Sequence, residues 1–231
     1  MVGEASRLFD LGTVPTRERI LVLPEPEEAE ERIKLMIHEV TEEDMSSGLS
    51  WYFDVNHLCQ EWSAQVGQAN FTPIHAAGII AALSPMRSWP DNIRMAREVL
   101  DTGTTTGLGH TLETAQLIRH GFDPEFLIGR TGQNLKVQAF FNNIAFPDTS
   151  KHVTVDRHMW TFLCNDFDVV RKAGLYFKSH EYEWASDRVR NVAADLEILP
   201  HQLQSVIWLS WRRKLGIVDD KVGAHQGQLN I

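Results

Sequence analysis

The stretch VTVDRHMWTFLCN, residues 153–165, decides how the fold of this chain is interpreted. Two β-branched residues lead to Asp156, and an apolar run begins almost directly behind it. Because aspartate is a preferred N-cap, the pattern predicts extended chain that turns into a buried helix at this residue. Arg157 and His158 follow the aspartate at the start of the expected helix.

The composition is that of a soluble globular protein. The chain has 231 residues, 43% of them hydrophobic and 23% charged, which is enough for one large domain or two small lobes that share a core. It contains no run of 18 apolar residues, and the start MVGEASRLFD has acids where a signal peptide has an apolar core. Two cysteines, Cys59 and Cys164, lack the spacing of a zinc or iron–sulfur site. We therefore expect a cytoplasmic protein with no metal, no other cofactor and no membrane partner.

Net charge argues at first against a nucleic-acid partner, because it is −9 at pH 7. The acids are concentrated near the N-terminus. Residues 1–50 hold 12 acidic and 5 basic side chains, whereas residues 51–231 hold 19 and 17. The acidic run over residues 25–44 is typical of a solvated helix face, and an acidic segment that mimics or repels phosphate is the alternative.

Apolar residues recur at helical spacing along the chain, and no segment has the alternation of a convincing strand, so the expected fold class is all-α. Residues 1–45 are expected to form an N-terminal arm and an acidic helix, and residues 46–231 a helical domain. TEEDMSSG, residues 41–48, is expected to be a loop, and the polar tail after Asp219 to be frayed. Besides the helix behind Asp156, helices are predicted over residues 27–40, 51–66, 73–84, 89–100, 112–120, 124–128, 134–144, 182–199 and 200–216.

Three segments stand in the order and at the approximate spacing of three motifs of one family: GIIAALSPMRSWPDNIRMAREVL (78–100), FLIGRTGQNLKVQAFFNNI (126–144) and VTVDRHMWTFLCN (153–165). Over roughly residues 75–165 the chain thus resembles the helix-hairpin-helix DNA glycosylase superfamily, which contains endonuclease III and adenine glycosylases. The resemblance implies a two-lobed helical fold with a degenerate helix-hairpin-helix, DNA as the partner, and Asp156 in the place of the family's catalytic aspartate.

Other parts of the chain extend or modify this resemblance. LPHQLQSVIWLSWRR, residues 199–213, is similar to a Trp-rich helix of phage-encoded relatives, some linked to DNA base hypermodification, which implies the host cytoplasm for a phage-encoded protein. The family hairpin reads Leu-Pro-Gly-Val-Gly, whereas LIGRTGQN (127–134) spaces its glycines differently. The glutamine that ends the first family motif is replaced around Pro85 and Met86. These departures predict weaker anchoring of duplex DNA through the hairpin.

Two catalytic candidates follow. Asp156 would stabilise the positive charge that N-glycosidic cleavage develops on the sugar, and as an N-cap it would alternatively bond the backbone amides of residues 158 and 159. One carboxylate can do both. In bifunctional family members a lysine near Lys136 attacks the sugar as a Schiff base, which needs a lowered pKa. An exposed helix lysine and a phosphate contact are the alternatives for Lys136.

The expected DNA-binding residues form two groups. Ser84, Arg87, Trp89 and Asn92 follow a buried helix, where Trp89 can stack on a flipped base and Asn92 can bond its edge. A hydrophobic staple and a first-turn polar residue are the alternatives for these two.

The second group is a local basic patch of Lys151, His152, Arg157 and His158, which suits backbone phosphate. A solvated loop, with His158 as a core histidine, explains the patch as well. On the last predicted helix, Trp208 is expected in the core beside exposed arginines, although seven tryptophans are enough for one or two to line a pocket.

Three functions are consistent with these residues. The first is an enzyme that cleaves the N-glycosidic bond of a base in DNA. The second is a phage-type transferase that attaches an amino acid or polyamine to an activated hydroxymethylpyrimidine in DNA. The third is a non-catalytic helical protein that binds a partner or mimics DNA.

Overall fold

The computed structural model describes residues 21–106, 109–129, 134–173 and 177–217. Within these ranges the chain is helical and has no strand, which confirms the all-α expectation. The helices are α1 (Pro26–Glu39), α2 (Glu42–Val66), α3 (Pro73–Leu83), α4 (Trp89–Thr102), α5 (Gly109–Arg119), α6 (Pro124–Gly129), α7 (Leu135–Ala145), α8 (Arg157–Cys164), α9 (Val169–Lys172), α10 (Ser179–Asp195) and α11 (Pro200–Lys214).

Three expectations fall on residues that the structure does not describe. Most of the expected N-terminal arm, residues 1–20, lies outside the described ranges, and so does the polar tail after Asp219. The turn of the expected hairpin, residues 130–133, lies outside them too.

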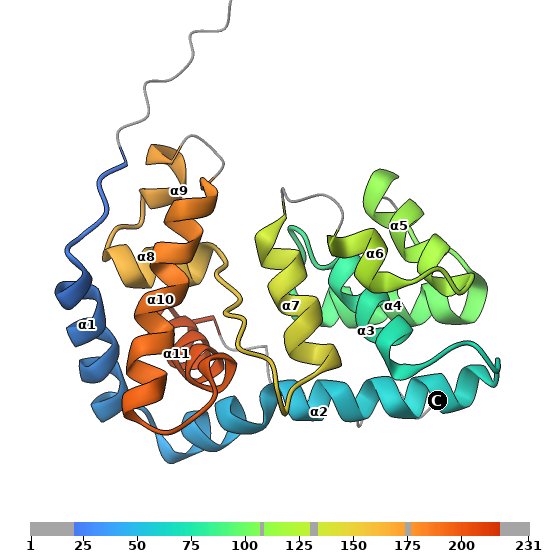
Figure 1. Cartoon of the computed structure of the whole chain (residues 1–231), viewed down its shortest axis with the longest axis horizontal. Coiled ribbons are helices and arrows are strands. Elements are labelled where there is room, and N and C mark those ends of the chain that lie inside the picture. Colours follow the sequence, from blue (N-terminus) through green and yellow to red (C-terminus); the bar gives the residue numbers. More distant parts are fainter. Residues whose placement is uncertain (1–20, 107–108, 130–133, 174–176, 218–231) are drawn as a thin grey trace, which may run out of the picture.

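The longest helix, α2, runs along one side of the molecule and carries two groups of helices (Figure 1). Helices α3 to α7 stand on one half of α2, and α1 and α8 to α11 stand around the other half. Each group has its own cluster of buried hydrophobic side chains. The partly buried Trp208 of α11 packs against both clusters, so this residue lies where the two groups meet.

The helix α3 organises the first cluster because its sequence is apolar nearly all round. Every residue from Ala76 to Leu83 is buried, and α3 packs against α2, α4, α5, α6 and α7. It begins as predicted at Thr72 and Pro73, where the backbone N–H of Thr72 donates to Nδ1 of His75 at 3.1 Å.

The acidic helix α1 is part of the second cluster. Ile33 and Met36 are buried there, and the helix packs against α10. Glu30 of α1 pairs with Arg188 at 3.5 Å and accepts a hydrogen bond from Asn191 at 2.8 Å. The acidic run therefore turns one face into the protein. Among its acids, Glu27, Glu28 and Glu31 are exposed, as expected for a solvated helix face.

The expected loop over residues 41–48 is wrong, because all but the first of these residues are the opening turns of α2. Thr41 is the N-cap, and its hydroxyl oxygen accepts a bond from the backbone N–H of Asp44 at 3.1 Å. The buried carboxylate of Asp44 pairs with Arg213 of α11. Tertiary contacts with α11 thus override the weak helix propensity of the two serines and Gly48.

Gly48 allows α2 and α11 to cross at very short range. A Cβ at this position would lie 2.5 Å from Cα of Val206, which is backbone and cannot move aside without shifting α11. The glycine is therefore required by the close approach of the two helices.

We expect Gly48→Ala to lower the free energy of unfolding by about 1–3 kcal/mol, because the added methyl group overpacks this crossing. Urea unfolding measures the change. The control Ser46→Ala changes an exposed side chain two residues before Gly48. Its free energy of unfolding is expected to stay within about 0.5 kcal/mol of the wild-type value. A Gly48→Ala variant as stable as the wild type would contradict the close packing.

Candidate functional site

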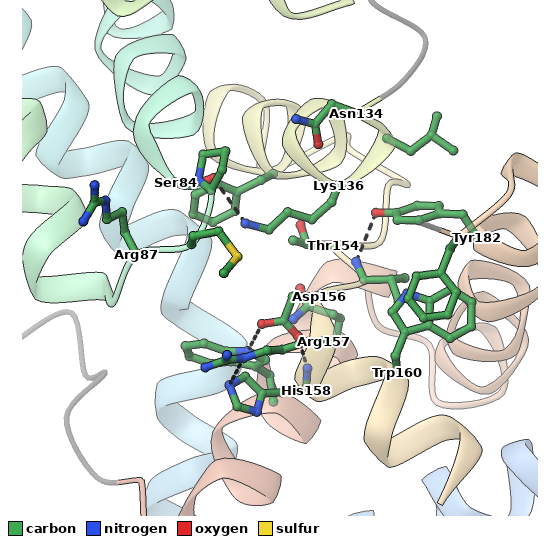
Figure 2. Close-up of a pocket in the computed structure, with 18 of the residues that line it drawn as sticks. Ser84, Arg87, Asn134, Lys136, Thr154, Asp156, Arg157, His158, Trp160 and Tyr182 are labelled. Carbon is green, nitrogen blue, oxygen red and sulfur yellow. Dashed lines mark hydrogen bonds between the residues drawn. The ribbon is translucent and has the colours of Figure 1, made fainter. Parts of the chain in front are cut away.

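A cleft of about 1010 Å³ lies between the two groups of helices and is lined by residues of both core clusters. Its walls come from α2, the turn between α3 and α4, the start of α4, α7, the extended segment before α8, α8 itself, α9, α10 and α11. This volume is at the upper end of the range of ligand pockets, about 300–1,000 Å³. Figure 2 shows the side chains that converge on the cleft.

The segment 153–155 carries the chain to the cleft in extended form without pairing as a strand. The hydroxyl of Tyr182 accepts a bond from the backbone N–H of Val155 at 3.0 Å (Figure 2). The same hydroxyl donates to the carbonyl oxygen of Val153 at 2.8 Å. The hydroxyl oxygen of Thr154 lies 2.9 Å from that of Tyr52 and accepts from Nδ2 of Asn143 at 3.1 Å. Side chains of three helices therefore satisfy this buried segment and fix the position of Asp156.

Asp156 is both the N-cap of α8 and a residue of the cleft wall. Its Oδ1 accepts bonds from the backbone N–H groups of His158 and Met159, each at 2.9 Å. Its Oδ2 accepts a bond from Nε1 of Trp208, also at 2.9 Å (Figure 2). Three N–H donors on two helices thus hold one partly exposed carboxylate in a single orientation at the cleft.

Trp208 is a residue whose role at the site the sequence did not predict. The indole bonds Asp156 on one side, and the guanidinium of Arg212 lies 4.4 Å from its ring centroid. Both side chains line the cleft and are partly buried. The expectation of a core tryptophan beside an exposed arginine is therefore wrong for this pair. Their spacing of four residues on α11, which places them on one helical face, is the signal that could have linked them.

Lys136 lines the same cleft as Asp156, so the interpretation as an exposed helix lysine is wrong. Its ammonium donates to the hydroxyl of Ser84 at 3.2 Å and lies 5.5 Å from the ring centroid of Phe140 (Figure 2). Burial lowers the pKa of Lys136, and the negative charge of Asp156 partly opposes this. The lysine is therefore easier to deprotonate than one in water.

The turn after α3 brings the other expected base-binding residues to the cleft. Ser84, Trp89 and Asn92 are buried and line it, and Arg87 lines it from an exposed position. The ring of Trp89 lies 4.8 Å, centroid to centroid, from that of Trp51. Trp51 is a second aromatic wall residue that the sequence did not single out.

The predicted basic patch is divided between two cavities. Arg157 and His158 line the cleft, whereas Lys151 and His152 line a smaller cavity of about 470 Å³ beside Arg190. The extended segment between them separates the two pairs, since extended chain advances about 3.3 Å per residue. Lys151 is therefore not a residue of the cleft.

The cleft is positively charged although the chain is acidic. Asp156 is its only carboxylate among the described residues, against five cations: Arg87, Lys136, Arg157, Lys178 and Arg212. Eight aromatic side chains also line it: Trp51, Tyr52, Trp89, Phe140, Trp160, Phe177, Tyr182 and Trp208. A cleft with this lining suits a ligand that carries negative charge and flat rings.

Among the described residues there is no group of three or more His, Cys, Asp or Glu side chains that could hold a metal ion. No helix in the described ranges is long and apolar enough to cross a membrane.

Comparison with known proteins places the chain in a family. The family's model matches residues 24–215. The chain belongs to DUF7178, a family of unknown function. Every residue that lines the cleft lies within the part matched by DUF7178. No curated protein and no solved structure matches the chain.

The cap role of Asp156 makes a prediction about stability. Asp156→Ala removes the acceptor for two amides of α8 and is expected to lower the free energy of unfolding by about 0.5–2 kcal/mol. Asp156→Asn keeps one oxygen that can accept the two amide bonds but loses the acceptor for Nε1 of Trp208, so it is expected to lie between Asp156→Ala and the wild type. Urea unfolding of the three proteins tests this, and equal stability of Asp156→Ala and wild type would exclude the cap.

The lowered pKa of Lys136 predicts a pH-dependent stability. Because the folded pKa is below the usual value of 10.5, the folded state binds fewer protons than the unfolded state between these values, and stability rises with pH there. The variant Lys136→Met has no such group. Its stability relative to the wild type should therefore be greatest near neutral pH and fall as the pH approaches 10.5.

Urea unfolding at several pH values from about 7 to 10 measures this difference. The control Ser46→Ala changes an exposed side chain that does not titrate, and its difference from the wild type should stay flat. A flat curve for Lys136→Met as well would contradict a lowered pKa.

Proposed function

We propose that this protein acts on a base in DNA and cleaves its N-glycosidic bond, with Asp156 stabilising the cationic transition state. The observation that carries the proposal is a carboxylate fixed by three N–H donors inside a cleft whose other charged side chains are cations. The cations suit the phosphates of the substrate, and the carboxylate suits the one atom that becomes positive during the reaction.

The two groups of helices correspond, in this proposal, to the two lobes of a helix-hairpin-helix DNA glycosylase. The order of the three sequence segments supports this assignment, as does the position of Asp156 at the cleft. Helices α6 and α7 flank the stretch that stands in the place of the hairpin, and the altered glycine spacing there makes it a degenerate one.

The reaction is a displacement at C1′ of the sugar. The C1′–N bond breaks and its electron pair leaves with the base, which takes up a proton. The oxygen of a water molecule bonds to C1′ and releases a proton. Asp156 stabilises the positive charge on the sugar between these events, and its three hydrogen bonds keep the oxygens from turning away.

Lys136 is the alternative nucleophile to water. Its pKa is lowered by burial, so more of it is the neutral amine that can attack C1′. Attack by the amine would form a C1′–N bond to the lysine as the base leaves. Breaking of the C1′–O4′ bond, with a proton passing to O4′, would then open the sugar ring and leave an imine in place of a free abasic site.

The substrate contacts are assigned by side-chain chemistry. Trp89 offers a face on which a flipped base can stack, and Asn92 an amide for its edge. Arg87, Arg157 and His158 are suited to the phosphates on either side of the base.

A second candidate is a transfer of an amino acid or polyamine onto an activated hydroxymethylpyrimidine in DNA. The cleft volume of about 1010 Å³ favours it, because this space can hold an amine beside the base. Both reactions develop positive charge on carbon, so Asp156 would serve the second in the same way.

The test is base release from oligonucleotides that carry damaged or 5-hydroxymethylated bases. We expect abasic sites, detected by strand cleavage in alkali, and a loss of about 100–1,000-fold in rate for Asp156→Asn. The control Asp54→Asn changes an exposed carboxylate of α2 and should act like the wild type. Activity retained in Asp156→Asn would refute the catalytic assignment.

The same samples separate the two candidate reactions. Mass spectrometry of an oligonucleotide with a phosphorylated hydroxymethylpyrimidine, incubated with amines, detects transfer without strand cleavage. The amine nitrogen bonds to the methylene carbon and phosphate leaves, so the mass changes by that of the amine minus that of phosphoric acid. That outcome would replace N-glycosidic cleavage by the second candidate.

A further inference from the structure

We propose that the cleft binds an unpaired DNA strand and not an intact duplex, which rests on the proposed function and names its substrate class. The inference rests on two features of the structure: the location of cations that are not paired with carboxylates, and the location of aromatic side chains. Both are found in the cleft.

Cations outside the cleft are mostly neutralised by neighbouring carboxylates. Ion pairs of this kind join Lys34 to Asp195, Arg94 to Glu98, Arg97 to Asp101, Lys172 to Asp166, Arg188 to Glu30, Arg190 to Glu183, Arg213 to Asp44 and Lys214 to Glu39. A duplex lying across these surfaces would meet paired charges rather than free cations.

Cations inside the cleft are less neutralised. Within the described part of the chain, Lys136, Arg157 and Lys178 form no ion pair with a carboxylate. They come from α7, α8 and the residue that caps α10, so they surround the cleft from different elements. Phosphates that enter the cleft therefore meet cations that no carboxylate pairs with, unlike most cations on the described outer surface.

The aromatic walls suit bases whose faces are free. Phe177 and Trp208 are the half-buried aromatic rings of the described lining, and Phe177 lies on the buried Trp160 with 3.7 Å between ring centroids and 3° between their planes. In a duplex each base is already stacked on its neighbours, so only an unpaired base can use such walls. A cavity of about 1010 Å³ also admits a few nucleotides of one strand more readily than a double helix.

Fluorescence anisotropy with the full chain and an unmodified, labelled 12-nucleotide single strand tests the proposal. We expect the single strand to bind at least tenfold more tightly than the duplex of the same sequence. The affinity should fall with salt, since the slope of log K against log salt concentration is about −0.7 for each phosphate that is neutralised on a single strand.

Two variants and one control locate the charge. Arg157→Gln and Lys178→Gln should each make the slope less steep by about 0.7, because each removes one cation that is exposed at the cleft. Arg94→Gln removes a cation of α4 that is paired with Glu98, and it should leave the slope unchanged. Equal slopes for all four proteins would overturn the assignment of the phosphates to the cleft.

The nature of the ligand is decided by competition. Equal affinity for the duplex, or displacement of the strand by inorganic polyphosphate as efficiently as by unlabelled DNA, would overturn the proposal, because either result means attraction of negative charge alone. Tighter binding of the single-stranded RNA of the same sequence would overturn the choice of DNA.

Failure of this inference and failure of the proposed function are distinguishable. Strand binding uses unmodified DNA and needs no reaction, so tight single-strand binding without base release would uphold the cleft assignment and refute the glycosidic activity. Base release from duplex substrates alone would do the reverse.

Discussion

Three N–H groups from two helices meet on the carboxylate of Asp156, and the arrangement of the cleft depends on this convergence. The two backbone donors belong to the first turn of α8, and the indole donor belongs to Trp208 of α11. Because α11 crosses α2 at Gly48, the carboxylate is tied through Trp208 to the longest helix of the protein. A shift of α11 would therefore move a donor of the site as well as part of the core.

The sign of the charge differs from one region of this protein to another, and the net charge of the chain does not show this. The acidic helix α1 turns part of its charge inward to Arg188, and several outer cations are paired. The cleft shows the opposite sign, with five cations and one described carboxylate. Since screening limits surface charges to a range of about 10 Å at ordinary salt, the local sign governs what enters the cleft.

The sequence predicted what depends on local pattern. The buried helix α3, its start at Thr72 and Pro73, and the cap at Asp156 follow from apolar spacing and N-cap chemistry, which are short-range properties. The start of α2 was missed because Asp44 is stabilised by Arg213, a residue 169 positions away. Trp208 was missed for the same reason, since its partner lies 52 positions before it.

The cleft also holds two features that the N-cap role of Asp156 does not account for. Burial disfavours the charged form of Lys136, and Met86, with φ of 61° and 91% of its surface exposed, holds a left-handed conformation at the cleft wall without glycine. Such a backbone costs of order 1–3 kcal/mol and persists where surrounding structure enforces it. An N-cap alone would explain Asp156, but it would explain neither of these two neighbours. Their common position on one basic, aromatic-lined cleft is consistent with the proposal that this cleft is a functional site.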